Sequence, residues 1–258
     1  MDLYQHFRPE EHPFIDQVIS WKEIVMRTYQ RKLTDFLNPR QQQIVDMLIG
    51  ANDYELTVGQ FGGGPFTERK RAIIAPYYEE MKNHSYKITL MQASYQKKFI
   101  TLQHRDVLGA FLSLGIKRDK LGDIIVENGT IQILCATEIA HYVRLNLTSI
   151  KNATIQLEEK PLSKLIEKKL VWQESMTTVS SLRLDNVIKE IYNISRKEAS
   201  EMIAKKLVKV NFKVIEDAKF QLQPEDLLSV RGKGRSKLVA VHSRTRKDRL
   251  RITTARLK

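Results

Sequence analysis

Residues 181–241 constrain the fold most, because two amphipathic helices and several short strands must pack within this stretch. The apolar residues of the first helix, which begins near Ser181 or Arg183, recur with helical spacing and predict one buried stripe: Leu184, Val187, Ile188, Ile191 and Ile194. Ser195 is predicted to cap the second helix, and Glu198 three residues later would complete a capping box. The second helix would bury Ala199, Met202, Ile203 and Leu207.

Strands are predicted after the two helices, at residues 208–211, 226–230 and 237–241. The sequence R-G-K-G-R at 231–235 links the last two strands, and its glycines let the backbone approach a phosphate between flanking cations. Aromatic residues are scarce here, with only Tyr192, Phe212 and Phe220. Recognition should therefore follow the backbone and shape of folded RNA, not stacking on single-stranded bases.

Positive charge is concentrated in the last third of the chain. The net charge of the whole sequence is +13, and residues 177–258 hold 20 Lys and Arg against 9 Asp and Glu, a net of +11. Such a distribution is expected when one module binds a polyanion; the alternative is a charged, solubilising terminus. The residues predicted to contact RNA are Arg183, Lys189, Ser195, Arg196, Lys197, Lys205, Lys206, Lys209, Asn211, Arg231, Lys233 and Arg235.

The first 83 residues predict a small α+β domain. A helix is expected at residues 13–31, and Asn38-Pro39 predicts the start of a second helix through a capping side chain and an N-terminal proline. Strands are expected at 56–61 and 71–75. Gly62-Gly63-Gly64 between them lacks the phosphate-loop pattern, which favours a flexible hairpin turn.

Residues 84–160 predict a β-α-β-β-α-β domain of the split βαβ, ferredoxin-like type, the order shared with the RRM. Asn128-Gly129 marks a hairpin between the two central strands, and the last strand is expected at 153–158. A helix at 105–114 would bury Val107, Leu108, Phe111 and Leu112. The central strands hold no aromatic residue, which argues against base stacking on this sheet. Secondary contacts with RNA or the ribosome are expected from Arg105, Lys117, Arg118, Arg69 and Lys70.

The remaining features limit the class of protein. We interpret residues 161–180 as a connector and 181–258 as the RNA-binding domain with a basic C-terminal tail. Cys135 is the only cysteine, which excludes intrachain disulfides and a cysteine-based zinc site. No apolar run is long enough to span a membrane, so we expect a cytoplasmic protein without metal or cofactor.

Two sets of motifs resemble known families. Arg183-Leu184-Asp185, Ser195-Arg196, Val210-Asn211 and Asp226 are similar to the RNA-binding domain named after ribosomal protein S-four. Lys206 and Phe212 stand where that domain usually has glycine, so the sequence departs from the pattern at two turns.

The rest of the chain resembles the bacterial YlmH family. The strings that carry this resemblance are F-G-G at 61–63, E-R-K-R at 68–71, H-R-D-V-L-G-A at 104–110, L-G-I-K-R at 114–118 and L-G-D-I-I at 121–125. The resemblance implies an N-terminal unit, an RRM-like middle and a C-terminal RNA-binding domain. It also implies a non-catalytic role in ribosome-associated quality control: binding to rRNA and tRNA of large ribosomal subunits that retain peptidyl-tRNA, as a monomer off the ribosome.

Two other functions remain open. The first is a pseudouridine synthase, in which Asp185 of the R-L-D string would be catalytic; however, only a short segment follows residue 241, too little for a catalytic domain. The second is a general RNA chaperone or a structural RNA binder associated with cell division.

Overall fold

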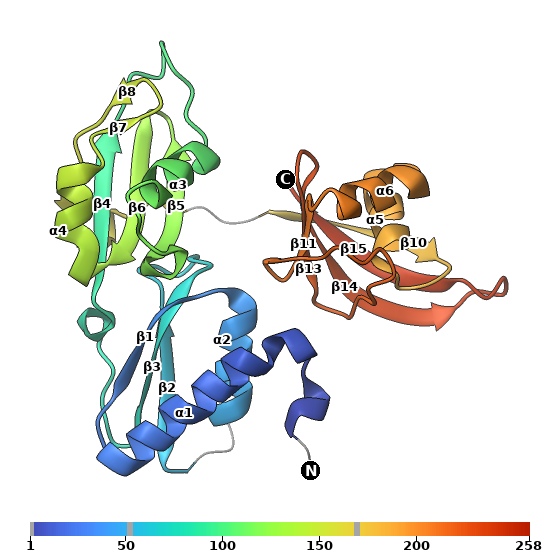
Figure 1. The fold of residues 1–258 in the computed structure, drawn as a ribbon, viewed down its shortest axis with the longest axis horizontal. Coiled ribbons are helices and arrows are strands. Elements are labelled where there is room, and N and C mark those ends of the chain that lie inside the picture. Colours follow the sequence, from blue (N-terminus) through green and yellow to red (C-terminus); the bar gives the residue numbers. More distant parts are fainter. Residues whose placement is uncertain (1–2, 51–53, 168–170) are drawn as a thin grey trace. The chain divides into compact units, whose positions relative to one another are not determined.

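The computed structural model describes residues 3–50, 54–167 and 171–258 (Figure 1). The chain forms two compact units, residues 1–168 and 169–258. The first unit contains two main sheets with separate hydrophobic cores, and the second contains one sheet covered by two helices. This mixture of helices and strands confirms the predicted α+β class.

The N-terminal part of the first unit is a three-stranded antiparallel sheet in the order β1-β3-β2. Its elements are the 3-10 helices Leu3–His6 and Pro9–Glu11, α1 (His12–Thr28), β1 (Lys32–Leu37), α2 (Pro39–Val45) with a π-helical turn at Asp46–Gly50, β2 (Leu56–Phe61) and β3 (Lys70–Pro76). Helices α1 and α2 bury Val18 and Val45 against one face of the sheet. The cap predicted at Asn38 is confirmed, because its side chain accepts a hydrogen bond from the Gln41 backbone at 3.0 Å.

Two details of this part differ from the prediction. Helix α1 ends at Thr28 and not at residue 31, because Tyr29 adopts a left-handed conformation with φ of 55°. Strand β1 follows at once and was not anticipated, since Thr34 and Asp35 interrupt its apolar pattern. Thr34 is nevertheless buried, because its hydroxyl accepts a hydrogen bond from Ala72 of β3.

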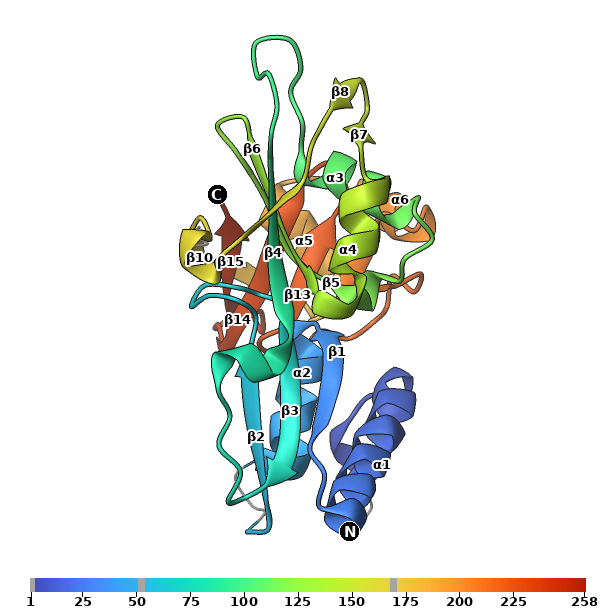
Figure 2. The same ribbon diagram turned by 90° about the vertical axis from the view of Figure 1, so that its left-hand side faces the viewer.

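The middle part of the first unit has the predicted β-α-β-β-α-β order. Its elements are β4 (Ile88–Ser94), α3 (His104–Leu112), β5 (Leu121–Glu127), β6 (Thr130–Ala136), α4 (Thr137–Asn146), β7 (Ser149–Ile150), β8 (Ala153–Thr154) and β9 (Glu158–Lys160), with 3-10 turns at Asn83–Tyr86, Arg118–Lys120 and Leu162–Lys164. The sheet order β5-β6-β4-β9 is that of a split βαβ fold. The hairpin at Asn128-Gly129 is confirmed, with φ of 47° and 82°. Figure 2 shows β3 leading through the turn at 83–86 into β4, so that the two sheets follow each other along the chain.

Two predictions for the middle part were wrong. The fourth strand is Glu158–Lys160, which pairs with β4, whereas Ala153–Thr154 forms a separate hairpin with β7. Leu112 is 40% exposed and does not face the core, although Val107 and Phe111 of the same helix are fully buried.

The sheet face opposite α3 and α4 is packed against protein. The Gln132 side chain on this face is 1% exposed, donates to the Lys164 carbonyl and accepts from the Ile166 amide, so the segment after β9 lies over the sheet. A Cβ on Gly63, which has φ of 104°, would lie 2.7 Å from Leu134. The glycine loop does join two antiparallel strands, as predicted; it is also tightly packed and helps cover the face on which an RRM stacks bases.

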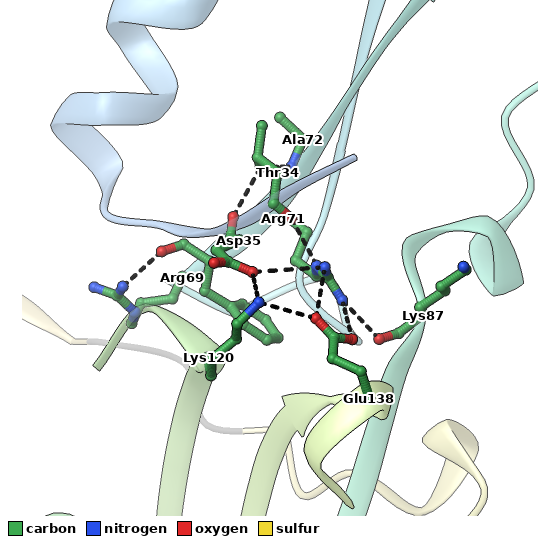
Figure 3. Close-up of polar contacts among 9 residues, drawn as sticks. Thr34, Asp35, Arg69, Arg71, Ala72, Lys87, Lys120 and Glu138 are labelled. Carbon is green, nitrogen blue, oxygen red and sulfur yellow. Dashed lines mark hydrogen bonds and ion pairs between the residues drawn. The ribbon is translucent and has the colours of Figure 1, made fainter. Parts of the chain in front are cut away.

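Buried polar groups join the two sheets of the first unit (Figure 3). The Arg71 side chain on β3 is 4% exposed and donates to the carbonyls of Thr34 and Lys87 at 2.8 and 3.0 Å. It also contacts Glu138 of α4 at 3.3 Å, and Lys120 bridges Glu138 and Asp35 at 3.1 and 2.6 Å. One buried guanidinium therefore links β1, β4 and α4.

Asp123 on β5 makes a second connection. Its carboxylate accepts hydrogen bonds from the backbone amides of Glu68 and Arg69 at 2.7 and 3.0 Å, and burial raises its pKa above the ordinary value. The Arg69 guanidinium donates to the carbonyls of Phe36 and Leu121. The strings at 68–71 and 121–125 that resemble a known family therefore meet at this junction.

The second unit is a six-stranded sheet in the order β10-β15-β14-β13-β11-β12. Its elements are β10 (Trp172–Val179), α5 (Leu184–Tyr192), α6 (Arg196–Ala204), β11 (Val208–Val210), β12 (Lys213–Val214), β13 (Leu227–Val230), β14 (Gly234–Arg244) and β15 (Leu250–Leu257). Strand β10 pairs with β15 along its whole length. The interpretation of 161–180 as a connector is therefore corrected: 172–179 is a strand of this unit, and the basic tail is its partner strand.

We predict that Arg71→Met lowers the free energy of unfolding of the first unit by about 3 kcal/mol, because it leaves two buried carbonyls without their donor and removes one of the two cations that contact Asp35 and Glu138. The measurement is urea unfolding followed by Trp21 fluorescence in a Trp172→Phe background, since the chain has 2 tryptophans and only Trp21 lies in this unit. The exposed pair Lys82–Glu80 provides the control, and Lys82→Met should cost less than about 0.5 kcal/mol. Equal effects of the two substitutions would contradict a structural role for Arg71.

Candidate RNA interface

The interface is built on the two predicted helices. Leu184, Val187 and Ile188 of α5 are fully buried, and Asn193 ends the helix in a left-handed conformation with φ of 51°. Ser195 caps α6 as predicted, because its hydroxyl accepts a hydrogen bond from the Glu198 backbone amide at 3.0 Å. The other half of the predicted capping box is replaced by an ion pair, since the Glu198 carboxylate lies 3.4 Å from Lys233 Nζ.

Asp185 is the centre of the interface. Its side chain is 2% exposed, and it accepts hydrogen bonds from Arg183 Nε and Nη2 at 3.1 and 2.9 Å and from Arg196 Nε at 3.0 Å. Burial raises the pKa of this carboxyl, but the hydrogen bonds from Arg183 and Arg196 outweigh it and hold the pKa below its ordinary value. The second position of the R-L-D string is equally structural, because Leu184 packs in the core.

The two arginines differ in exposure, and this decides what they can bind. The Arg183 side chain is 26% exposed and the Arg196 side chain 58% exposed. The Arg196 contact with Asp185 uses Nε, so the outer edge of this guanidinium faces solvent with its remaining donors. A guanidinium held in one orientation loses little entropy when it binds a phosphate oxygen.

The glycine-basic turn at 231–235 reaches the start of α6. Tyr192 fixes this turn, because its hydroxyl lies 3.1 Å from the Gly234 carbonyl and 3.0 Å from the Ser236 hydroxyl. Gly232 and Gly234 have φ of 82° and 95°, a conformation that favours glycine. Lys233, through its contact with Glu198, lies beside the turn that carries Arg196. Lys233 therefore lies near the first turn of α6, on which Arg196 also stands.

The two departures from the S-four pattern keep the geometry of glycine. Lys206 and Phe212 have φ of 58° and 70°, so both turns retain the left-handed conformation despite a side chain. Asn211, next to Phe212, also has positive φ and bonds Asp226 Oδ1 and the Leu227 amide with its side chain. Its amide group therefore holds the turn, and one N–H of this group is left for the predicted RNA contact.

The other predicted RNA contacts are distributed over the unit. Lys189, Lys205 and Lys206 pair with Glu190, Glu201 and Glu216 at 3.1, 3.9 and 3.0 Å. Lys197, Lys209 and Arg231 are exposed, as are the paired Lys205 and Lys206, and Arg235 is half-buried on β14.

The secondary contacts divide into two groups. Arg69 and Arg118 belong to the junction of the first unit, where Arg118 donates to the Leu121 carbonyl and burial lowers its pKa to about 10. Their guanidinium groups bond backbone carbonyls within the unit, which leaves them fewer donors for the predicted RNA contacts. Arg105 and Lys117 are exposed, and Lys70 is half-buried on β3.

Two contributors to the interface were missed by sequence reasoning. The Arg256 guanidinium lies 5.0 Å from the centroid of the Tyr192 ring, and this cation–π contact joins β15 to α5. Arg249 donates to the hydroxyl and carbonyl of Thr178 and lies 3.7 Å from Glu190. No local signal reveals these contacts, because they join residues far apart in the sequence.

The described residues offer no group of His, Cys, Asp and Glu side chains arranged to hold a metal ion. None of the described helices combines the length and apolar character that crossing a membrane requires. Cys135 is buried in the middle core, and burial raises the pKa of its thiol to about 12.

The fold defines a protein with an S4-type RNA-binding domain in its second unit. Residues 182–228 match the S4 domain family, and residues 82–164 match the family described as "Putative RNA-binding domain in YlmH". The chain is 39% identical to the Ribosome-associated protein quality control protein P2 of Bacillus subtilis (strain 168), over 100% of this chain and 99% of that protein. The chain therefore belongs to the YlmH family.

A solved structure agrees with this assignment. The Cell division protein ylmH from Streptococcus pneumoniae is 31% identical to this chain, with a TM-score of 0.55, and the match covers 64% of this chain and 99% of that one.

We predict that Lys206→Gly stabilises the second unit by about 0.5 to 1 kcal/mol, because glycine adopts positive φ without the penalty of a Cβ. Thermal unfolding followed by Trp172 fluorescence in a Trp21→Phe background measures this change. The matched control is Lys205→Gly, one residue earlier at φ of −78°, which should destabilise the unit by a similar amount. A loss of stability on Lys206→Gly would contradict strain at this position.

We also predict a pH signature for Asp185. Its folded pKa lies below its unfolded pKa, so its contribution to stability is present above about pH 4 and is lost as pH falls through the folded pKa. Asp185→Asn should lower the free energy of unfolding at pH 7 by about 3 kcal/mol, and its difference from the wild type should shrink below about pH 4. The exposed Asp248→Asn is the control and should change stability by less than about 0.5 kcal/mol. A difference that is independent of pH would contradict this role for the charge.

Proposed function

We propose that this protein docks, without catalysis, on structured rRNA and tRNA of the large ribosomal subunit. It would act there in ribosome-associated quality control, on stalled complexes that retain peptidyl-tRNA. The observation that carries the proposal is the buried Asp185 carboxylate, which orients Arg183 and Arg196 at the surface of the S4 domain. The printed name of the Bacillus subtilis relative supports the ribosomal setting.

The physical basis is recognition of backbone shape. Folded RNA presents phosphates at fixed spacing, and cations that are already oriented bind them with little loss of side-chain entropy. Arg196 and Lys233, both near the start of α6, would each contact a phosphate. The S4 domain would supply affinity, and the first unit would help to select the position on the ribosome. We place the protein in the cytoplasm, as a monomer off the ribosome.

The alternative of a pseudouridine synthase conflicts with the position of Asp185. A nucleophilic carboxylate must reach the substrate base, whereas this side chain is 2% exposed and both its oxygens accept hydrogen bonds from guanidinium groups. The R-L-D string thus serves to build the binding surface.

A role in cell division is the second candidate, favoured by the printed name of the Streptococcus pneumoniae structure. Sedimentation of cell extracts through sucrose gradients separates the two. Co-migration with the large subunit supports ribosomal docking, while a free or membrane-bound distribution supports the structural alternative.

We predict that Arg196→Ala weakens binding to purified bacterial large subunits about 10-fold at low salt and reduces the slope of log Kd against log salt by about 1, because one phosphate contact is lost. Filter binding over a salt series measures both quantities. Arg196→Lys keeps the charge but loses the planar fork, so it should restore the salt slope and only part of the affinity. An unchanged affinity for Arg196→Ala would overturn the assignment of this residue.

A further inference from the structure

The hairpin of β14 and β15 lies beyond residues 182–228, which match the S4 domain. Its outer part, residues 242–251, reads H-S-R-T-R-K-D-R-L-R. The cations of this segment greatly outnumber its single acid, Asp248: they are Arg244, Arg246, Lys247, Arg249 and Arg251. Figure 1 shows the hairpin tip extending past the ends of α5 and α6. We refer to residues 242–251 as the basic hairpin.

The tip of the basic hairpin is ordered by its own hydrogen bonds. The Thr245 amide donates to the Arg249 carbonyl at 2.8 Å, and the Asp248 amide donates to the Thr245 carbonyl at 2.9 Å. Asp248 is occupied by Arg244, whose Nη1 lies 2.9 Å from its carboxylate. The one acidic side chain is therefore paired internally, and the backbone of the turn is closed.

The root of the basic hairpin is fixed to the helix that begins with the arginine site. Arg249 donates to Thr178 on β10 and contacts Glu190 on α5. Strand β15 pairs with β10 up to Val179↔Leu250. Because α5 begins directly after Arg183, the basic hairpin and the Asp185-held arginines belong to one scaffold.

Three cations of the basic hairpin are exposed: Arg246, Lys247 and Arg251. Within the described part of the chain, no group forms a hydrogen bond or ion pair with the side-chain cations of these three residues. Lysine and arginine side chains that project from a rigid turn without an acidic partner are suited to a polyanion.

We propose that the basic hairpin is a second RNA-binding site, which lays Arg246, Lys247 and Arg251 on the phosphate backbone of double-helical RNA. The proposal rests on the proposed function and adds a contact outside the S4 helix pair. Residues 234–257 contain no Phe, Tyr or Trp, so stacking on single-stranded bases is disfavoured. The described residues of the hairpin expose no large apolar side chain, which disfavours insertion into a membrane.

The test is Arg246→Ala/Lys247→Ala, assayed by filter binding to purified large subunits, to a blunt RNA duplex and to a single strand of equal length. The slope of log Kd against log salt should fall by about 1 to 2 for the subunit and the duplex, with affinity about 10-fold weaker at low salt. The matched control is Arg27→Ala/Arg144→Ala, which removes two exposed charges from the first unit and should leave binding unchanged. Circular dichroism checks that the fold is kept, and Arg246→Lys should bind like the wild type.

Several results would overturn this site while the proposed function stands. One is an unchanged salt slope for the double variant when Arg196→Ala still weakens binding. Another is a loss of affinity in the double variant that is confined to single-stranded RNA. A loss of affinity only for vesicles of anionic phospholipid would overturn the site as well. Nucleotide-resolution footprinting gives an independent check, because Arg196→Ala and the double variant should lose protection at different RNA segments. If the wild-type protein does not bind the large subunit, the proposed function is wrong. Binding to the RNA duplex then decides whether the basic hairpin is an RNA-binding site.

Discussion

The first unit depends on a buried positive charge that must be satisfied. Arg71 is 4% exposed, and an unpaired guanidinium at such a site would cost several kcal/mol. Its partners come from β1, the start of β4 and α4, so satisfying one side chain fixes the N-terminal sheet against the middle domain. The same junction uses Arg69, Asp123 and the glycine loop, which places the YlmH sequence strings at a structural joint.

In the second unit the buried charge that must be compensated is negative. Asp185 is a buried anion, and the groups that compensate it are two arginines at the surface. The compensation holds two cations in one orientation, and an oriented guanidinium is suited to binding a phosphate. One carboxylate would therefore link the folding of this unit to the RNA contact that we propose.

Local chemistry explains what could be predicted. The caps at Asn38 and Ser195 and the turn at Asn128-Gly129 depend only on neighbouring residues. The apolar stripe of α5 indicates which face of that helix is buried. All of these features could therefore be predicted. Strand β1 and strand β10 were missed, since each is stabilised by pairing with a distant strand more than by an apolar pattern. The internal role of Arg69 and Arg118 could not be predicted, because charge alone does not distinguish a solvated cation from one that bonds buried carbonyls.

The sequence by itself determined the class of the protein: the helix pair, the β-α-β-β-α-β order and the concentration of positive charge in the last third. It also indicated that Arg183-Leu184-Asp185 is structural. The tertiary structure alone decided which cations remain available. Hydrogen bonds between distant residues assign Arg69 to the junction, Asn211 to a turn and Arg249 to the root of the basic hairpin. The physical reason is that a charge acts through its neighbours in space, and those neighbours are set by folding.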